Sequence, residues 1–494
     1  MSTYSQEDTE NTREPDGVDG SATRSKKSGA ARIPHIYVII FAVISMAAAA
    51  TYLVPAGAYD MLPGPQGHDV VDPDSFRYVD ASPVSPMGFL TAIPRGIVDA
   101  GEVVMFCLMI GGAFMVLRAT GIIHLAVDRL ARRFAHRGLL IIPLLMVPFA
   151  VLATFIGTPE LSLVYIPVIL PLMLALGFDS ITAAATALCA TAAGFTAALT
   201  NPVTVGLSQE IAGIPLYSGM GLRFVLLIAA VTAAVLYVMR YAAKVRRNPE
   251  RSLVHAEDKK KREEIPGAAG INESEALTAS RRQKLGIAVL LGFFALLLYG
   301  VLGRGWFMLE MAGLFIAMGV VVGLIVGLST TEVCESFTEG MRSVLLGAVI
   351  VGVARAVAVV LEDGEILDTI VHGLATVTQA LPTFLTPIGM LIVQALFNFL
   401  VPSGSGQAII TMPIMAPLAD IVGVTRQTAV LAFQIGDGFA NVFYPTSGYF
   451  MACLALAGIP WTRWIRFMWP LMLIWLAMGT TTLMIAHAIG WGPV

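Results

Sequence analysis

The stretch Phe399-Leu400-Val401-Pro402-Ser403-Gly404-Ser405-Gly406 interrupts a long apolar part of the sequence with proline, serine and glycine. A related stretch, Phe155-Ile156-Gly157-Thr158-Pro159-Glu160, precedes it by 243 residues when their prolines are aligned. In both copies a second polar interruption has its proline 43 residues after the first, in Thr200-Asn201-Pro202 and in Tyr444-Pro445-Thr446-Ser447. Equal spacing at separate positions predicts that the chain contains a duplication.

The composition places this repeated pattern in a membrane. Of 494 residues, 56% are hydrophobic and only 13% are charged, and the mean hydropathy is +0.77. Soluble domains carry about 25% charged residues, and apolar runs of about 20 residues can cross a hydrocarbon core of about 30 Å. We therefore predict a polytopic membrane protein whose surroundings are the lipid bilayer.

Charged residues set the expected orientation, because lysine and arginine concentrate in cytoplasmic loops. Residues 1–32 are predicted to form a disordered cytoplasmic tail, and residues 244–284 form a strongly basic loop that should also be cytoplasmic. The loop over 55–86 is acidic and should lie outside. Two predicted amphipathic arms follow the same rule. Ile122–Arg137 is basic and Glu362–Leu381 is acidic, so they should lie on opposite faces.

The predicted architecture is an all-α membrane fold with two inverted repeats. Residues 33–243 form the first repeat, with a re-entrant hairpin over 138–176. Residues 306–489 form the second, with a hairpin over 382–422, and residues 285–305 are the linking span. Nine spans with two hairpins that enter from opposite faces are typical of secondary transporters.

Each repeat is also predicted to contain one discontinuous helix. The break lies near Thr200–Pro202 in the first repeat and over Gly436–Ser447 in the second.

The second span should begin near Glu102 and end near Ala119. The four cysteines show no pairing or metal-ligand spacing, and we expect them to be small buried apolar residues.

The four polar interruptions are the candidate binding site, because non-helical backbone at membrane depth is tolerated only when it is buried in protein or lines a wet cavity. Ser403, Gly404, Ser405 and Gly406 precede an apolar helical run, so their amides would converge at a helix N-terminus, which suits an anion such as a carboxylate. Thr158 and Glu160 flank Pro159 in the order of a helix cap, and both capping and ligand binding remain open for them.

The helix breaks supply the remaining candidates. Asp437 is an ionisable residue in the middle of a span, which is a functional hypothesis by default. Asn201, Thr446 and Ser447 would offer amides, carbonyls and hydroxyls to a solute or a coupling ion. Asn441 has the same capacity, with polar contact between helices as its alternative role.

The sequence gives no support to an enzyme. It contains no GxxxxGK[ST] and no HExxH motif, and Pro402-Ser403-Gly404-Ser405-Gly406 lacks the first glycine of GxSxG. The seven histidines form no cluster. We expect no catalytic residue, no metal, no cofactor and no nucleic-acid partner.

A family resemblance rests on four motifs: Gly352-Val353-Ala354-Arg355, Glu362-Asp363-Gly364, the stretch Asn398 to Gly406, and Gly436-Asp437-Gly438. With them the chain resembles the YfcC branch of the C4-dicarboxylate anaerobic carrier (DcuC-like) family, in the ion transporter superfamily. The resemblance covers roughly residues 33–489. It implies an elevator-type homodimer in the bacterial cytoplasmic membrane that carries small organic solutes, and in this branch basic amino acids with arginine/ornithine exchange.

The acidic candidates bear on the substrate. Glu160 and Asp437 would both belong to the central region, and two carboxylates in a low-dielectric site disfavour an anion unless they are protonated. They favour an ammonium or guanidinium group instead. The sequence therefore predicts a basic amino acid antiporter. An ion-coupled carrier of C4-dicarboxylates or short-chain carboxylates, driven by H+ or Na+, is the alternative.

Overall fold

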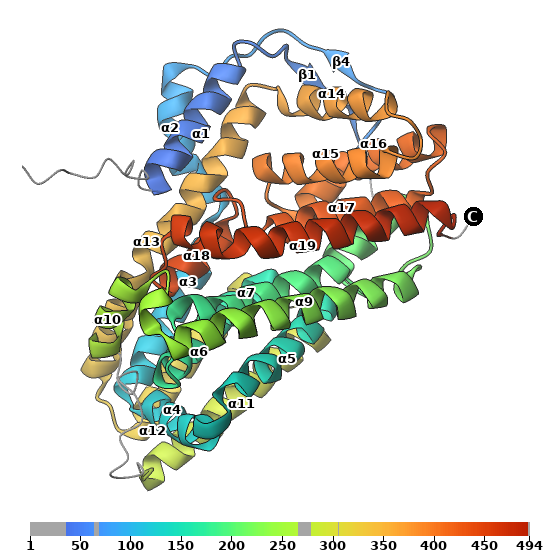
Figure 1. Ribbon diagram of the computed structural model, residues 1–494. Coiled ribbons are helices and arrows are strands. Elements are labelled where there is room, and N and C mark those ends of the chain that lie inside the picture. The colour runs from blue at the N-terminus through green and yellow to red at the C-terminus, as the bar shows by residue number, and fades with distance from the viewer. Residues whose placement is uncertain (1–35, 64–68, 265–277, 305, 493–494) are drawn as a thin grey trace, which may run out of the picture. The chain divides into compact units, whose positions relative to one another are not determined.

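The computed structural model describes residues 36–63, 69–264, 278–304 and 306–492, and most of them are helical (Figure 1). The predicted disordered tail lies outside the described residues. Within the described ranges, eight helical stretches are long and apolar enough to cross a membrane. The described helices fall into two groups, which we name the long-helix group and the broken-helix group.

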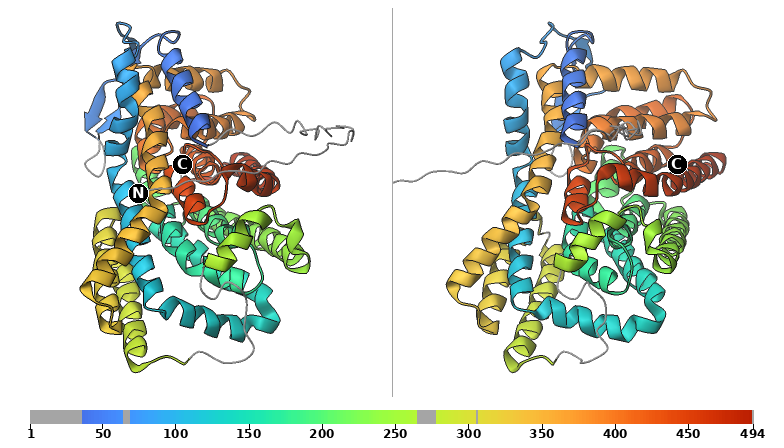
Figure 2. Two further views of the ribbon diagram at one scale, coloured as in Figure 1. Left: turned by 90° about the vertical axis from the view of Figure 1, so that its left-hand side faces the viewer. Right: turned by 60° about the vertical axis from the view of Figure 1, so that its left-hand side comes forward.

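The long-helix group contains continuous helices. They are α1 (Ile36–Ala50), α2 (Pro86–Asp99), α3 (Gly101–Ala119), α11 (Arg281–Arg304), α12 (Met308–Val326) and α13 (Thr330–Asp363). α2 and α3 follow one another along α13 (Figures 1 and 2). Small residues permit this contact, since a Cβ on Gly96 would lie 2.5 Å from the carbonyl oxygen of Gly352.

α3 matches the predicted second span, which was expected to begin near Glu102 and end near Ala119, and α2 is a further helix that was not predicted from the sequence. α2 is only 14 residues long, and its sequence contains Pro94 and the charged Arg95. Packing on α13 therefore stabilises α2, and so does the ion pair in which Arg95 donates to both oxygens of Asp363, at 2.5 and 2.8 Å. Neither contact can be read from local apolarity.

The broken-helix group contains the two helix pairs predicted to be re-entrant hairpins, the discontinuous helices, and one long continuous helix at the end of each half. Its first half comprises α5 (Ile141–Ile156), η3 (Pro159–Leu161), α6 (Ser162–Ala175), α7 (Ser180–Ala197), η4 (Pro202–Gly206), α8 (Leu207–Ile211) and α9 (Met220–Arg247). Its second half comprises α15 (Thr386–Leu400), α16 (Gly404–Ile421), α17 (Arg426–Ala440), α18 (Gly448–Leu456) and α19 (Trp461–Ala488). α7 packs against α17 at the centre of the group.

The two halves have the same order of elements at the predicted spacing. α4 (Ile122–Phe134) and α14 (Leu367–Gln379) are the amphipathic arms, and each helix from α4 to α9 begins within three residues of the position 243 before its counterpart. Contacts follow the order of the elements, since α1 packs on α13 while α12, which begins 272 residues after α1, packs on α3. This order supports the duplication. The inversion of one repeat relative to the membrane stays a prediction.

The chain is mostly helical, as predicted, and short strands occur only in the segment after α1 among the described residues. β1 (Gly57–Ala58) pairs with β4 (Arg77–Tyr78), and β2 (Met61–Pro63) pairs with β3 (Asp69–Val71), both antiparallel. This segment contacts the arm α14, because the backbone N–H of Tyr59 donates to Asp368 and the Tyr59 hydroxyl lies 3.0 Å from His372 Nδ1.

Two further expectations are wrong in detail, the start of the second break and the burial of Cys334. α17 continues to Ala440, so the second break spans 441–447 and does not begin at Gly436. The glycines instead permit close helix packing, since a Cβ on Gly436 would lie 2.7 Å from Gln394 Cβ in α15. The basic loop contains a helix, α10 (His255–Glu264). Cys334 is exposed, whereas Cys107, Cys189 and Cys453 are buried as expected.

Candidate functional site

The first hairpin tip lies against the first helix break. Gly157 ends α5 with a φ of +75°, and a Cβ placed on it would collide with the side-chain amide of Asn201. A second contact joins the same elements, because the Thr154 hydroxyl accepts a hydrogen bond from the backbone N–H of Leu199 at 3.0 Å. The sequence candidates Thr158 and Asn201 are therefore brought together.

The second tip, between α15 and α16, also lies against the first helix break. A Cβ on Gly404 would lie 2.6 Å from Thr204 Cγ2 in the first break and 3.1 Å from Asp437 Oδ2 in α17. Ser403 is the N-cap of α16, and its hydroxyl accepts a hydrogen bond from the backbone N–H of Gly406 at 3.3 Å. Ser403 therefore caps α16, and the predicted ligand role of this tip stays a prediction. Ser403, Gly404, Ser405 and Gly406 are half-buried.

Asn201 uses its side chain within its own break. Its Oδ1 accepts from the backbone N–H groups of Val203 and Thr204 at 2.9 and 3.2 Å, and its Nδ2 donates to the Thr204 hydroxyl at 2.6 Å. These bonds fix the π-helical turn η4, and Pro202 removes a donor that the turn could not satisfy. Asn201 therefore shapes the site, and its amide is already occupied.

Asp437 is fully buried in the last turn of α17 and lies at the end of a chain of amides. Its Oδ1 accepts from Asn398 Nδ2 at 2.7 Å and from Asn441 Nδ2 at 2.9 Å. Asn398 Nδ2 also lies 3.2 Å from Gln407 Oε1, and Gln407 Nε2 donates to Gln394 Oε1 at 2.7 Å. The second hairpin thus positions Asp437 through α15 and α16.

Asn398, Gln407 and Gln394 were not among the predicted site residues. A signal for two of them exists in the sequence, because Gln394 and Asn398 stand four apart on one face of the otherwise apolar α15. Nothing in the sequence shows which helix faces them. Asn441 caps the end of α17 and donates to the backbone carbonyl and the carboxylate of Asp437 in the same helix, so neither its predicted ligand role nor the alternative contact between helices is tested.

Buried polar oxygens without a partner gather in these elements. Within the described ranges, eight buried side-chain oxygens make no hydrogen bond, and all but Ser208 Oγ and Gln434 Oε1 lie in or close to the tips and the second break: Thr158 Oγ1, Asn398 Oδ1, Asp437 Oδ2, Asn441 Oδ1, Thr446 Oγ1 and Ser447 Oγ. Thr158 makes no capping bond, which leaves its hydroxyl available to a ligand. A buried polar atom that lacks its partner costs about 1–3 kcal/mol. A ligand that donates protons, or a cation, would satisfy this set of oxygens.

Glu160 adds a second carboxylate. It is half-buried in η3, which contacts both α7 and α18. The hydroxyl of Ser162 lies 3.3 Å from Cys453 Sγ and joins the start of α6 to α18. Thr446 and Ser447 directly precede α18. Both tips and both breaks therefore belong to one region.

The site does not have the composition of a metal centre with histidine, cysteine or acidic ligands. Across the described residues no three such side chains stand close enough to hold one ion. The available ligands are amide, hydroxyl and carboxylate oxygens, which suit organic cations, protons or hard cations.

Comparison with known proteins identifies the chain. A family profile described as C4-dicarboxylate anaerobic carrier matches residues 33–488. The chain belongs to this family. One relative, from Escherichia coli (strain K12), is a candidate basic amino acid antiporter named YfcC; it is 34% identical over 90% of this chain and 94% of its own length. An uncharacterised protein of Haemophilus influenzae is 27% identical over 93% of this chain and 98% of its own.

Two solved transporters show a more distant likeness. The Alcanivorax borkumensis transporter YdaH and the Neisseria gonorrhoeae efflux pump MtrF each align with 93% of the chain, over 100% and 96% of their own lengths. Both are 16% identical with a TM-score of 0.40, too low to support an argument about mechanism. Membership of the carrier family and the apolar spans confirm a multi-pass transporter of the bacterial cell membrane.

Proposed function

We propose that this carrier exchanges basic amino acids of the arginine and ornithine type across the cytoplasmic membrane. The observation that carries the proposal is the set of buried oxygen atoms without donors around Asp437 and the first tip, which also carries the half-buried Glu160. Two carboxylates at low dielectric disfavour an anion and favour a guanidinium or ammonium group. Exchange of one such solute for another needs no net movement of charge.

The proposed solute lies between the second tip and the two acids. Ser403, Ser405 and the first backbone amides of α16 would receive the α-carboxylate, because a helix N-terminus carries roughly half a positive charge. Glu160 and Asp437 would face the cationic side chain. The hydroxyl oxygens of Thr158, Thr446 and Ser447 would accept hydrogen bonds from the remaining N–H groups of that side chain. This would explain why these hydroxyls have no partner among the described residues.

Transport itself would follow an elevator motion in a homodimer. The broken-helix group would move against the long-helix group, and the arms α4 and α14 would connect the two. In this proposal α4 lies on the cytoplasmic face and α14 on the outer face, as the distribution of lysine and arginine predicts.

The second candidate is a carrier of C4-dicarboxylates or short-chain carboxylates coupled to H+ or Na+. The description of the matched family favours it. Glu160 and Asp437 would then be proton sites, as intramembrane acids often are, or the partnerless oxygens would receive the ion.

The deciding experiment compares Glu160→Gln and Asp437→Asn with the control Asp420→Asn in liposomes. Asp420 is half-exposed and pairs with Arg426, away from the site. We expect both site variants to lose arginine or ornithine exchange about 30-fold or more, since losing a buried charge partner costs roughly 2 kcal/mol or more. The control should keep it. Succinate uptake by the unmutated protein without arginine uptake would overturn the proposal.

A further inference from the structure

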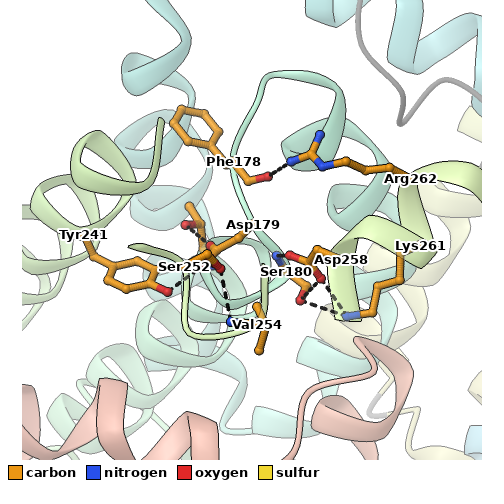
Figure 3. A network of polar contacts seen from close by, with 10 residues as sticks. Phe178, Asp179, Ser180, Tyr241, Ser252, Val254, Asp258, Lys261 and Arg262 are labelled. Carbon is orange, nitrogen blue, oxygen red and sulfur yellow. Dashed lines mark hydrogen bonds and ion pairs between the residues drawn. The ribbon is translucent and has the colours of Figure 1, made fainter. Parts of the chain in front are cut away.

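The basic loop folds back onto one end of the broken-helix group. Its described part forms η5 (Pro249–Arg251) and α10, and Figure 3 shows how α10 is attached. The Asp258 carboxylate accepts from the backbone N–H of Ser180 at 2.7 Å and from the Ser180 hydroxyl at 2.6 Å. Ser180 is the first residue of α7, so the acid also faces the positive end of that helix.

A second acid fixes the preceding segment. Asp179 caps α7 by accepting from the backbone N–H of Thr182 at 2.8 Å. Its other oxygen accepts from the hydroxyls of Tyr241 in α9 and Ser252, both at 2.7 Å (Figure 3). Arg262 donates to the carbonyl of Phe178 in the same turn. This network, from Phe178 to Arg262, holds α10 in a defined position relative to α7.

Lys261 is the side chain that this attachment positions. Its ammonium donates to Asp258 and to the Ser180 hydroxyl, both at 2.9 Å (Figure 3). An ammonium has three donors, and these bonds use two. The side chain is only 15% exposed. It extends to the turn after α18, since a Cβ on Gly458 would lie 2.8 Å from Lys261 Cε.

Beside this lysine lies a cavity between the two helix groups. Its volume is about 340 Å³, within the range of small-molecule pockets, about 300–1,000 Å³. Residues of α3, α13, α6 and α18 form most of its lining. The ionisable side chains of the lining are Arg118, His124 and Lys261, each from a different helix, and no described lining residue is acidic.

The cavity lies at the far ends of two helices that begin at the candidate site. α6 starts just after the first tip and reaches the cavity with Pro167, Leu170 and Pro171. α18 starts at the end of the second break and reaches it with Ala455 and Leu456. The lysine-rich helix α10 places the cavity on the face that is predicted to be cytoplasmic.

We propose that this cavity is a cytoplasmic entry site that binds the carboxylate of the solute, with Lys261 as its principal cationic partner. The inference rests on the proposed carrier function, and it holds for both candidate substrates because each carries a carboxylate. In this proposal the entry site and the central site recognise different parts of the solute. Basic groups at the entry attract the carboxylate end, while Glu160 and Asp437 in the central site select the rest of the molecule.

A labelling experiment tests the charge of the cavity without transport. Ser343 is exposed and lines the cavity, so Ser343→Cys in a Cys334→Ser background provides one reactive thiol there. We expect an anionic methanethiosulfonate reagent to react faster than a cationic one. Lys261→Gln should lower this ratio about fivefold, the effect of one partly exposed charge. Lys259→Gln removes the same charge from an exposed position on α10 and should change the ratio little. Equal ratios in the two variants would refute the proposal.

A sided transport measurement tests the role of the lysine. In liposomes of known orientation, Lys261→Gln should raise the cytoplasmic KM about fivefold, leave the external KM unchanged, and be rescued by Lys261→Arg. Lys259→Gln removes the same charge from an exposed position on α10 and leaves the attachment intact, so it should not raise the cytoplasmic KM. Similar losses on both sides in Lys261→Gln would show a structural role only. Absence of any solute exchange by the unmutated protein would refute the proposed function instead, while the labelling ratio would still test the cavity.

Discussion

Gly157 is the residue on which the first tip depends most directly, because it has a left-handed backbone and no room for a side chain. We expect Gly157→Ala to abolish exchange, since the new Cβ collides with Asn201 and displaces the first break. Gly177→Ala is the matched control. Gly177 has a φ of +84° but nothing within 4 Å of its Cβ position, so it should cost only the left-handed strain of about 1–2 kcal/mol and keep exchange. Equal exchange in both variants would contradict this role for Gly157.

Asn398 allows a second test at the level of single residues. It donates to Asp437 from α15, so Asn398→Ala removes one of the two side-chain donors of that carboxylate. We expect a loss of about tenfold or more in the affinity for the cationic solute, from a charge-assisted bond worth roughly 1.5–3 kcal/mol. Thr411→Ala removes a hydroxyl from the same amide chain farther from Asp437 and should cost less. Affinity can be measured by counterflow. A larger loss of affinity in Thr411→Ala than in Asn398→Ala would contradict the proposed role of these amides in positioning Asp437.

The sequence predicts the residues of the site better than their partners. Proline, glycine and serine inside apolar runs are visible without a structure, because they interrupt a helix wherever the chain goes. The contact of Gly404 with Asp437 is not, since it joins positions on different helices. The role of Gly436 and Gly438 likewise depends on packing that the sequence does not show. Glycine predicts either a break or a close approach, and only the packing of α17 decides between them.

At the scale of elements, the helices that sequence reasoning missed are those stabilised by tertiary contacts. α2 is stabilised by its packing on α13, and α10 by its hydrogen bonds to Ser180 and Phe178. A charged segment such as α10 has no apolar face of its own to reveal it. The arms α4 and α14 were visible because each carries its amphipathic pattern locally.

The contact between the β-strand segment and α14 leads to a pH-dependent prediction. Burial raises the pKa of Asp368 above its usual value, although the N–H of Tyr59 opposes the shift. A raised folded-state pKa contributes stability below the unfolded pKa of about 3.9 and loses it as pH rises through the folded pKa. Asp368→Asn should therefore raise the unfolding temperature at neutral pH, and the gain should vanish below about pH 4.

The control for this prediction is Asp74→Asn, which changes an exposed acid in the same segment. It should leave the unfolding temperature of the purified full-length protein unchanged across the same pH range. A lower unfolding temperature for Asp368→Asn at neutral pH would show that the charged carboxylate stabilises this contact, contrary to the burial argument.

For the whole molecule, the duplication relates contacts as well as helix ends. α1 from the first half packs on α13 from the second, and α12 from the second half packs on α3 from the first. The two halves are therefore joined by equivalent contacts. If the halves are inverted in the membrane, α4 and α14 lie on opposite faces, and so do the two hairpin entrances. The orientation of the chain therefore decides whether the cavity beside Lys261 is an entry from the cytoplasm.

Single-cysteine labelling of intact cells measures that orientation. Cys334 is exposed, so Cys334→Ser comes first. Asp74 and Lys260 are exposed positions in the acidic and the basic loop, and each is replaced by cysteine in that background. Because lysine and arginine concentrate in cytoplasmic loops, a membrane-impermeant thiol reagent added outside should label Asp74→Cys in intact cells and Lys260→Cys only after permeabilisation. Labelling of Lys260→Cys but not of Asp74→Cys in intact cells would reverse the topology, and the cavity would then open to the outside.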